Sequence, residues 1–316
     1  MRRFAHMIIT VKDLVKRYGN LVALDHFDLE VREGEILGLL GPNGSGKTTV
    51  LNCILALLTY NNGDICVFGR PMAPDAYDIK RDIGVVMQNV AVFNELTVWE
   101  NVYFFCGLYI TDKAECRRLT EEAIEFTGLN EYRKFYPKKL SGGLLRRLNI
   151  ACGIAHRPKL IILDEPTVAV DPQSRNNILE GIKELNRNGA TVLYTSHYME
   201  EVEQICTRIV ILDHGRVIAD GTKEELKNMI SLGEKITVET NMISDGQISV
   251  LKSIPGVDTV SYDGHELIVC SAKDRNNLED VLDFLKKQSV GYGRIYSEMP
   301  TLNDVFLELT GKELRD

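Results

Sequence analysis

Residues 41–48 carry the clearest chemical signal in the sequence, because they match the spacing GxxxxGK[ST]. An apolar run at 36–40 precedes them, and apolar residues at 51, 54, 55 and 58 follow, which predicts a strand before this loop and a helix after it. In such a loop the backbone N–H groups turn toward an anion, Lys47 reaches terminal phosphates and Thr48 offers a hydroxyl to Mg²⁺. The helix N-terminus adds positive potential. The predicted phosphate-binding residues are Gly41, Pro42, Asn43, Gly44, Ser45, Gly46, Lys47, Thr48 and Thr49.

Two acidic residues, Asp164 and Glu165, follow a second apolar run at 160–163. Adjacent acids after a strand are often only a solvated turn. Together with the phosphate-binding loop they favour a catalytic interpretation, in which Asp164 holds Mg²⁺ directly or through water. Glu165 would then act as the general base, or polarise the water that attacks the terminal phosphate.

The order of elements around these motifs predicts a mostly parallel sheet. Residues 8–31 alternate around a turn at 18–20, which predicts antiparallel strands beside the nucleotide site. A strand at 83–87 ends on Gln88, and residues 89–139 look like a helical insertion, opened by a capping box from Thr97 to Glu100. From residue 141 onward, helices alternate with apolar strands, and this alternation predicts parallel strands with helices on both faces.

After residue 231 the pattern changes to strand, helix, strand, strand, helix, strand, the order of a split βαβ unit. A last helix starts at Thr301, with Asp304 as its capping partner. We therefore predict two domains: residues 1–230, with a helical subdomain at about 89–156, and a small α+β, ferredoxin-like domain at 231–316.

Composition excludes several classes of protein. The chain has 316 residues and a formal net charge of -8, which argues against a sequence-independent grip on nucleic acid. No apolar stretch approaches the roughly 20 residues of a membrane span, and the first residues lack the apolar segment of a signal peptide. The seven cysteines are scattered, with no CxxC pair, and are typical of reduced thiols in a cytosol.

A third motif points beyond a single chain. Ser141, Gly142 and Gly143 follow Leu140 and precede a helix, and so form another anion-seeking helix start. One chain has no second terminal phosphate for it, so a second protomer is expected. With the two earlier motifs in order, residues 7–230 resemble the nucleotide-binding subunit of an ATP-binding cassette (ABC) transporter.

The resemblance implies roles for four more residues. Tyr18 resembles the aromatic that stacks on adenine, and Gln88 the residue that contacts Mg²⁺ and the attacking water. His197 resembles the switch histidine at the terminal phosphate. Asp171 matches the aspartate at the dimer seam, and it also fits a plain helix N-cap before Pro172. Without the resemblance, Gln88 and His197 would be interpreted as structural residues, and Tyr18 could equally be a half-packed surface tyrosine at a turn.

One position departs from the family pattern. Leu144 stands where the common signature has glutamine after the two glycines. The atoms that meet phosphate are the serine hydroxyl and the glycine amides, so ATP sandwiching should be spared, although a water-mediated contact could be lost. Residues 171–175 and 301–311 resemble multidrug-type exporter ATPases with a C-terminal accessory domain.

The resemblance implies an α/β P-loop ATPase with an antiparallel β subdomain and a helical subdomain. Two copies, or one copy and a paralogous cassette, would sandwich two MgATP, and closure would drive a separate permease at the cytoplasmic face of the cell membrane. The apolar residues at 102, 104, 105 and 108 would receive a helix of the permease, or form the core of the helical region. The alternatives are an importer ATPase, a DNA-repair or translation ABC ATPase, and a catalytically silent cassette.

Overall fold

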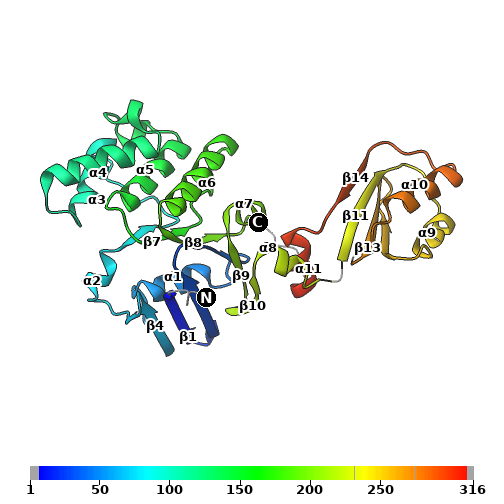
Figure 1. Ribbon diagram of the computed structural model, residues 1–316, viewed down its shortest axis with the longest axis horizontal. Helices are drawn as coiled ribbons and strands as arrows, with labels where there is room; N and C mark the ends of the chain where they lie inside the picture. Colours follow the sequence, from blue (N-terminus) through cyan, green and yellow to red (C-terminus); the bar gives the residue numbers. More distant parts are fainter. Residues whose placement is uncertain (1–6, 231, 274, 312–316) are drawn as a thin grey trace, which may run out of the picture. The chain divides into compact units, whose positions relative to one another are not determined.

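The computed structural model describes residues 7–230, 232–273 and 275–311. The chain divides into two compact units, with the boundary in the sequence between Thr222 and Lys223, and each is described by itself (Figure 1). None of the helices in the described residues combines the length and the apolar character that crossing a membrane requires. All seven cysteines are free thiols, as the sequence predicts.

An antiparallel sheet opens the first unit, with its strands in the order β2-β1-β4-β5. The hairpin between β1 and β2 turns at Gly19, whose φ of 57° lies in the left-handed region that glycine tolerates. This confirms the predicted antiparallel pair around residues 18–20. The strands of this sheet are β1 (Met7–Tyr18), β2 (Leu21–Arg32), β4 (Asn62–Val67) and β5 (Arg70–Pro71).

The second sheet of this unit runs in the order β10-β9-β3-β8-β7-β6. Its strands are β3 (Ile36–Leu40), β6 (Ile83–Val86), β7 (Leu160–Asp164), β8 (Thr191–Ser196), β9 (Arg208–Asp213) and β10 (Arg216–Gly221). Every neighbouring pair is parallel except β9 and β10. The mostly parallel sheet is thus confirmed. Because the carboxyl ends of parallel strands share one edge, the loops after β3, β6, β7 and β8 converge there.

The helices that contact strands of this sheet are α1 (Lys47–Ile54), α6 (Pro172–Arg187) and α7 (Met199–Ile205). A short helix, α2 (Tyr77–Lys80), precedes β6. The expectation that the helix after the phosphate loop includes Leu58 is wrong, because α1 ends at Ile54. Ala56 adopts a φ of 52°, and the N–H groups of Leu57 and Leu58 both bond to the Asn52 carbonyl, at 2.8 and 3.1 Å. The chain therefore turns away at that point.

The helical subdomain follows β6 and has its own apolar core. Its helices are α3 (Val98–Gly107), α4 (Lys113–Phe126), η1 (Asn130–Tyr132), η2 (Pro137–Lys139) and α5 (Gly142–Ile154). Figure 1 shows α3, α4 and α5 together, away from β1 and β4. The predicted capping box of α3 is confirmed: the Thr97 hydroxyl accepts from the Glu100 N–H, and the Glu100 carboxylate accepts from the Thr97 N–H.

The second unit contains a sheet in the order β12-β13-β11-β14, covered on one face by α9 and α10. Its elements are α8 (Lys223–Lys227), β11 (Leu232–Glu239), α9 (Asp245–Lys252), β12 (Val257–Tyr262), β13 (Glu266–Ala272), α10 (Leu278–Lys287), β14 (Ile295–Glu298) and α11 (Leu302–Thr310). The order from β11 to β14 is the predicted one, and the capping box of α11 from Thr301 to Asp304 is present. The ferredoxin-like description of this domain stays a prediction.

Candidate active site

The phosphate-binding loop joins β3 to α1 at the carboxyl edge of the parallel sheet. Gly46 begins the helix with a φ of 114°, and a Cβ there would lie 2.9 Å from the Ala23 carbonyl oxygen, so glycine is required on both counts. Lys47 folds back over the loop, and its Nζ donates to the carbonyl oxygens of Gly41, at 2.7 Å, and Pro42, at 3.2 Å. These two hydrogen bonds hold the start of the loop against the lysine that begins α1.

Two features of this loop fit a bound phosphate. The Ser45 hydroxyl is buried without a hydrogen-bond partner. The Lys47 side chain is only 4% exposed, and its Nζ lies 3.4 Å from Glu165 Oε1. Burial lowers the pKa of Lys47, and the neighbouring Glu165 carboxylate opposes that shift. An incoming phosphate would give both the lysine and the serine the anionic partner that a buried donor needs.

Asp164 and Glu165 leave the end of β7 in different directions. Asp164 is buried, and its carboxylate accepts from the Thr48 hydroxyl at 3.0 Å and from the Thr195 hydroxyl at 2.7 Å. Glu165 has a φ of 46°, unusual for a residue with a side chain, and its N–H donates to Thr195 Oγ1 at 3.1 Å. Thr195, which sequence reasoning missed, therefore orients both acids from the neighbouring strand β8.

The Glu165 carboxylate is where the predicted catalytic residues meet. Gln88, which follows β6, donates from Nε2 to Glu165 Oε2 at 3.1 Å. His197, which follows β8, places Nδ1 3.3 Å from Glu165 Oε1. With Lys47 on the same oxygen, three of the predicted side chains converge on one carboxylate. This arrangement can hold a polar small molecule, and the carboxylate can accept a proton from it.

A cavity of 410 Å³ adjoins this cluster. It brings Tyr18 together with residues of the phosphate-binding loop, Gln88 and Glu165. Tyr18 is 46% exposed at the end of β1. Sequence reasoning missed four of the lining residues: Leu21, Val22 and Ala23 on β2, and His214. Leu21, Val22 and Ala23 follow Tyr18 across the hairpin but reach the phosphate-binding loop only through the fold, and no local motif marks any of the four.

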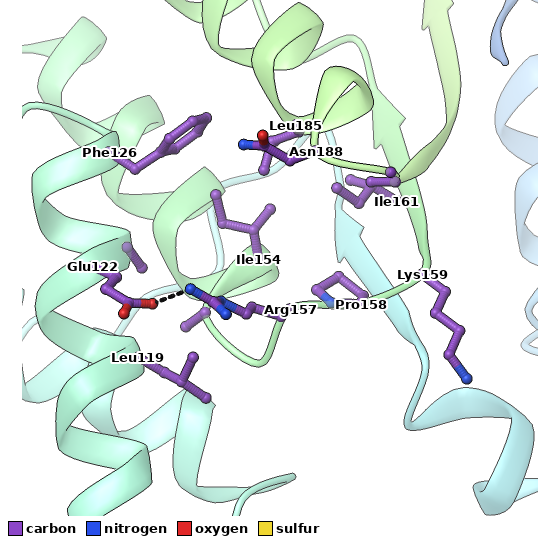
Figure 2. A pocket seen from close by; sticks show the side chains of 14 residues that line it. Leu119, Glu122, Phe126, Ile154, Arg157, Pro158, Lys159, Ile161, Leu185 and Asn188 are labelled. Atoms are coloured by element: carbon purple, nitrogen blue, oxygen red, sulfur yellow. Dashed lines mark hydrogen bonds and ion pairs between the residues drawn. The ribbon is translucent and has the colours of Figure 1, made fainter. Parts of the chain in front are cut away.

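A larger cavity of 610 Å³ lies elsewhere in the first unit, between α4, the end of α5 and the end of α6. Figure 2 shows its apolar side chains, among them Leu119, Phe126 and Ile154, and an ion pair of 2.6 Å between Glu122 and Arg157 at its edge. None of the predicted site residues lines it. We therefore assign the active site to the smaller 410 Å³ cavity, which the phosphate-binding loop lines.

The residues beside the phosphate loop also fit Mg²⁺. The Thr48 hydroxyl, the Asp164 carboxylate and the Gln88 amide are hard oxygen donors, the kind that this ion prefers. In the part of the chain that the structure describes, no cluster of three or more His, Cys, Asp or Glu could hold a metal. A site with one carboxylate suits an ion that keeps waters and takes further ligands from phosphate.

The third motif, Ser141 to Gly143, lies outside the 410 Å³ cavity at the phosphate-binding loop. Ser141 caps α5 by accepting from the Leu144 N–H at 3.3 Å, and Asp171 caps α6 by accepting from the Ser174 N–H at 2.9 Å. That hydrogen bond lowers the pKa of the Asp171 carboxyl. The two helix starts touch, since a Cβ on Gly143 would lie 2.5 Å from Ser174 Oγ. None of Ser141, Gly142, Gly143 and Asp171 is among the residues that line the 410 Å³ cavity.

Comparison with known proteins identifies the family. Residues 24–168 match the ABC transporter family, and residues 221–310 match the family of the DrrA1-3-like ATP-binding protein C-terminal domain. The chain is 36% identical over 313 residues to the linearmycin resistance ATP-binding protein LnrL of Bacillus subtilis (strain 168), covering 98% of this chain and 100% of LnrL. The chain belongs to the ATP-binding proteins of ABC transporters. This ABC protein is an ATPase.

Another relative and two solved structures are also similar to the ABC ATPase. The daunorubicin resistance ATP-binding protein DrrA3 of Streptomyces coeruleorubidus is 36% identical, over 98% of both chains. Among solved structures, an ATP-binding subunit of an ABC transporter aligns with a TM-score of 0.65 at 28% identity, over 70% of this chain and 92% of that one. The dimeric structure of MJ0796, a bacterial ABC transporter cassette, aligns with a TM-score of 0.62 at 29% identity, over 68% and 98%.

Leu144, the departure from the usual signature, packs against the core of the helical subdomain. The side chain of this residue is not one of the donors at the start of α5, so we expect Leu144→Gln to keep the ATPase rate within about twofold of the parent. A modest loss of thermal stability should accompany the lost apolar packing. Steady-state ATP hydrolysis and a melting curve check this. A tenfold loss of rate would show that position 144 takes part in the reaction.

Proposed function

We propose that this ABC ATPase binds and hydrolyses MgATP to drive export through a separate membrane permease, working at the cytoplasmic face of the membrane. The observation that carries the catalytic part is the convergence of Lys47, Gln88 and His197 on the Glu165 carboxylate beside the phosphate-binding loop. Export is supported by the names of the relatives, which include two resistance proteins and a Nod factor export ATP-binding protein of Ralstonia nicotianae.

The main residues of the predicted site each have a task in this proposal. Lys47 and the N–H groups of the loop bind the phosphates, and Tyr18 stacks on adenine. Glu165 accepts a proton from the attacking water, which Gln88 and His197 help to orient. Thr48, Asp164 and Gln88 would hold Mg²⁺, which when bound neutralises phosphate charge. Lys47 Nζ lies 3.4 Å from Glu165 Oε1, so a terminal phosphate would compete with this carboxylate for the lysine.

The active site is composite in this proposal. Ser141 and the Gly142 and Gly143 amides present donors at a helix start, but these residues do not line the cavity of their own chain. The related cassette MJ0796 has been solved as a dimer. We therefore propose that the Ser141 loop of one copy, or of a paralogous cassette, closes on the ATP held by the other, with Asp171 at the seam.

Not all of the apolar residues that the sequence offers for docking the permease are exposed. Val102 is fully buried in the helical core. Phe104 and Leu108 are 43% and 62% exposed, and the exposed ring of Phe93 contacts Phe104 at a centroid distance of 5.0 Å. An exposed aromatic pair, with an exposed leucine at the C-terminus of the helix that carries Phe104, suits an apolar helix of a partner. We therefore assign docking to Phe93, Phe104 and Leu108, and leave Val102 to the core.

Reconstitution tests the export assignment. The chain is co-expressed with the membrane protein encoded beside it, the complex is placed in proteoliposomes with the ATPase outward, and uptake of a fluorescent amphipathic dye is followed after ATP addition. We expect ATP-dependent accumulation inside the vesicles, which correspond to inverted cells, and none with the Glu165→Gln variant. ATP-driven loss of preloaded dye from these vesicles would instead identify an importer.

A further inference from the structure

A buried carboxylate behind the active site, Glu201 on α7, collects three hydroxyl donors on one oxygen. Glu201 is 2% exposed, and its Oε2 accepts from Tyr194 at 2.6 Å, from Thr167 at 2.7 Å and from Ser196 at 3.1 Å. A buried charge is stable only when such partners compensate for its lost hydration. The Glu201 carboxylate and these hydroxyls therefore form one unit, and losing the acceptor would leave three donors without it.

The other oxygen of Glu201 reaches a different element. Its Oε1 lies 3.3 Å from Nε of Arg175 on α6. The Arg175 guanidinium lies over the Tyr198 ring at 4.8 Å, and the Tyr198 ring contacts the His197 ring at a centroid distance of 4.1 Å. A planar cation over an aromatic face is a favourable contact. A chain of contacts thus runs from Glu201 through Arg175 and Tyr198 to His197.

These partners belong to the two segments that carry the reaction groups. Thr167 lies two residues after Glu165 in the loop that leads to Asp171, and Arg175 lies one helical turn after Asp171. Ser196 precedes His197, and its hydroxyl accepts from the Tyr198 N–H at 2.9 Å. One side chain therefore ties the loop after β7 to the loop after β8. The pKa of Tyr194 is well above its usual range because of burial and the Glu201 charge, so its hydroxyl keeps its proton.

We infer that Glu201 is a positioning residue for ATP hydrolysis, which holds the Glu165–Asp171 loop and His197 in the register that lets both meet the terminal phosphate. Glu201 touches no reacting atom and acts through Thr167, Ser196 and Arg175. The inference rests on the proposed roles of Glu165 and His197. The inference predicts that turnover depends on the charge and the shape of residue 201. It also predicts that ATP binding at the phosphate loop does not depend on them.

Glu201→Gln tests this prediction, because the substitution keeps the shape of the side chain and removes its charge. We expect kcat to fall about tenfold, because a 1 Å misplacement of reacting groups can cost about a hundredfold and a substitution that keeps the shape should displace them less. The Kd for a fluorescent ATP analogue should stay unchanged. The matched control is Glu35→Gln: Glu35 is also a buried carboxylate, 2.9 Å from an arginine, Arg208, but lies at the end of β3 opposite the phosphate loop. It should lose thermal stability with its kcat kept.

Three results would overturn the inference: a parental kcat for Glu201→Gln, equal loss of kcat in the control, or a weakened ATP affinity. If Glu201→Gln does not fold, Arg175→Gln replaces it, because the Arg175 side chain is 29% exposed and its loss should be tolerated. The same fall in kcat is expected there, and a parental kcat would again contradict the inference. Failure of the proposed function is distinguishable, since it would appear as undiminished hydrolysis by Glu165→Gln.

Discussion

Replacing Glu165 by glutamine is expected to lower ATP hydrolysis by at least about a hundredfold while ATP binding persists, because the amide cannot accept a proton from water. Lys47, whose Nζ lies 3.4 Å from Glu165 Oε1, should also engage phosphate more readily once the competing charge is gone. The variant should therefore accumulate as an ATP-bound dimer. Steady-state hydrolysis and size-exclusion chromatography with ATP measure the two effects.

The control for this variant is the same chromatography with ADP in place of ATP. With ADP in place of ATP the Glu165→Gln protein should elute as a monomer, since the terminal phosphate is what both copies would contact. Hydrolysis at the parental rate would remove Glu165 from the reaction. A dimer that forms equally with ADP would mean that association does not depend on the terminal phosphate.

Replacing Lys47 by alanine is expected to weaken ATP binding by about a hundredfold or more, since truncating a buried charge that meets an opposite charge costs roughly 2–5 kcal/mol. The loss includes the two hydrogen bonds by which Nζ ties the loop to the carbonyls of Gly41 and Pro42. Titration with a fluorescent ATP analogue measures it. Lys159→Ala is the matched control, because Lys159 is exposed and lines the other cavity. Unchanged affinity in Lys47→Ala would place the nucleotide elsewhere.

The sequence predicts those parts of the site that are local in the chain. The phosphate loop is a fixed spacing between a strand and a helix, and the two acids follow an apolar run, so pattern and position are enough to find Lys47, Asp164 and Glu165. The same holds for the hairpin at residue 19 and the capping boxes at Thr97 and Thr301. In each, the interacting residues are neighbours in sequence.

Residues that act through sheet register or tertiary packing escape such reasoning. Thr195 orients Asp164 only because β7 pairs with β8 so that these two residues lie side by side. A threonine in the apolar run 191–196 is the single sequence signal. Glu201 looks like one of several acids on a surface helix, and only the packing of α7 against the loop after β7 buries it. The end of α1 was also missed, because a left-handed Ala56 has no sequence signature.

Mixing two inactive variants tests the composite site most directly. Lys47→Ala impairs the phosphate loop, and Ser141→Arg blocks the helix start that would close on the partner's ATP. Each alone should hydrolyse almost nothing. If each site draws on both copies, random mixing restores about a quarter of the parental rate, because half of the dimers are mixed and each holds one intact site. A mixture as inactive as its parts, or full activity of Ser141→Arg alone, would contradict the account.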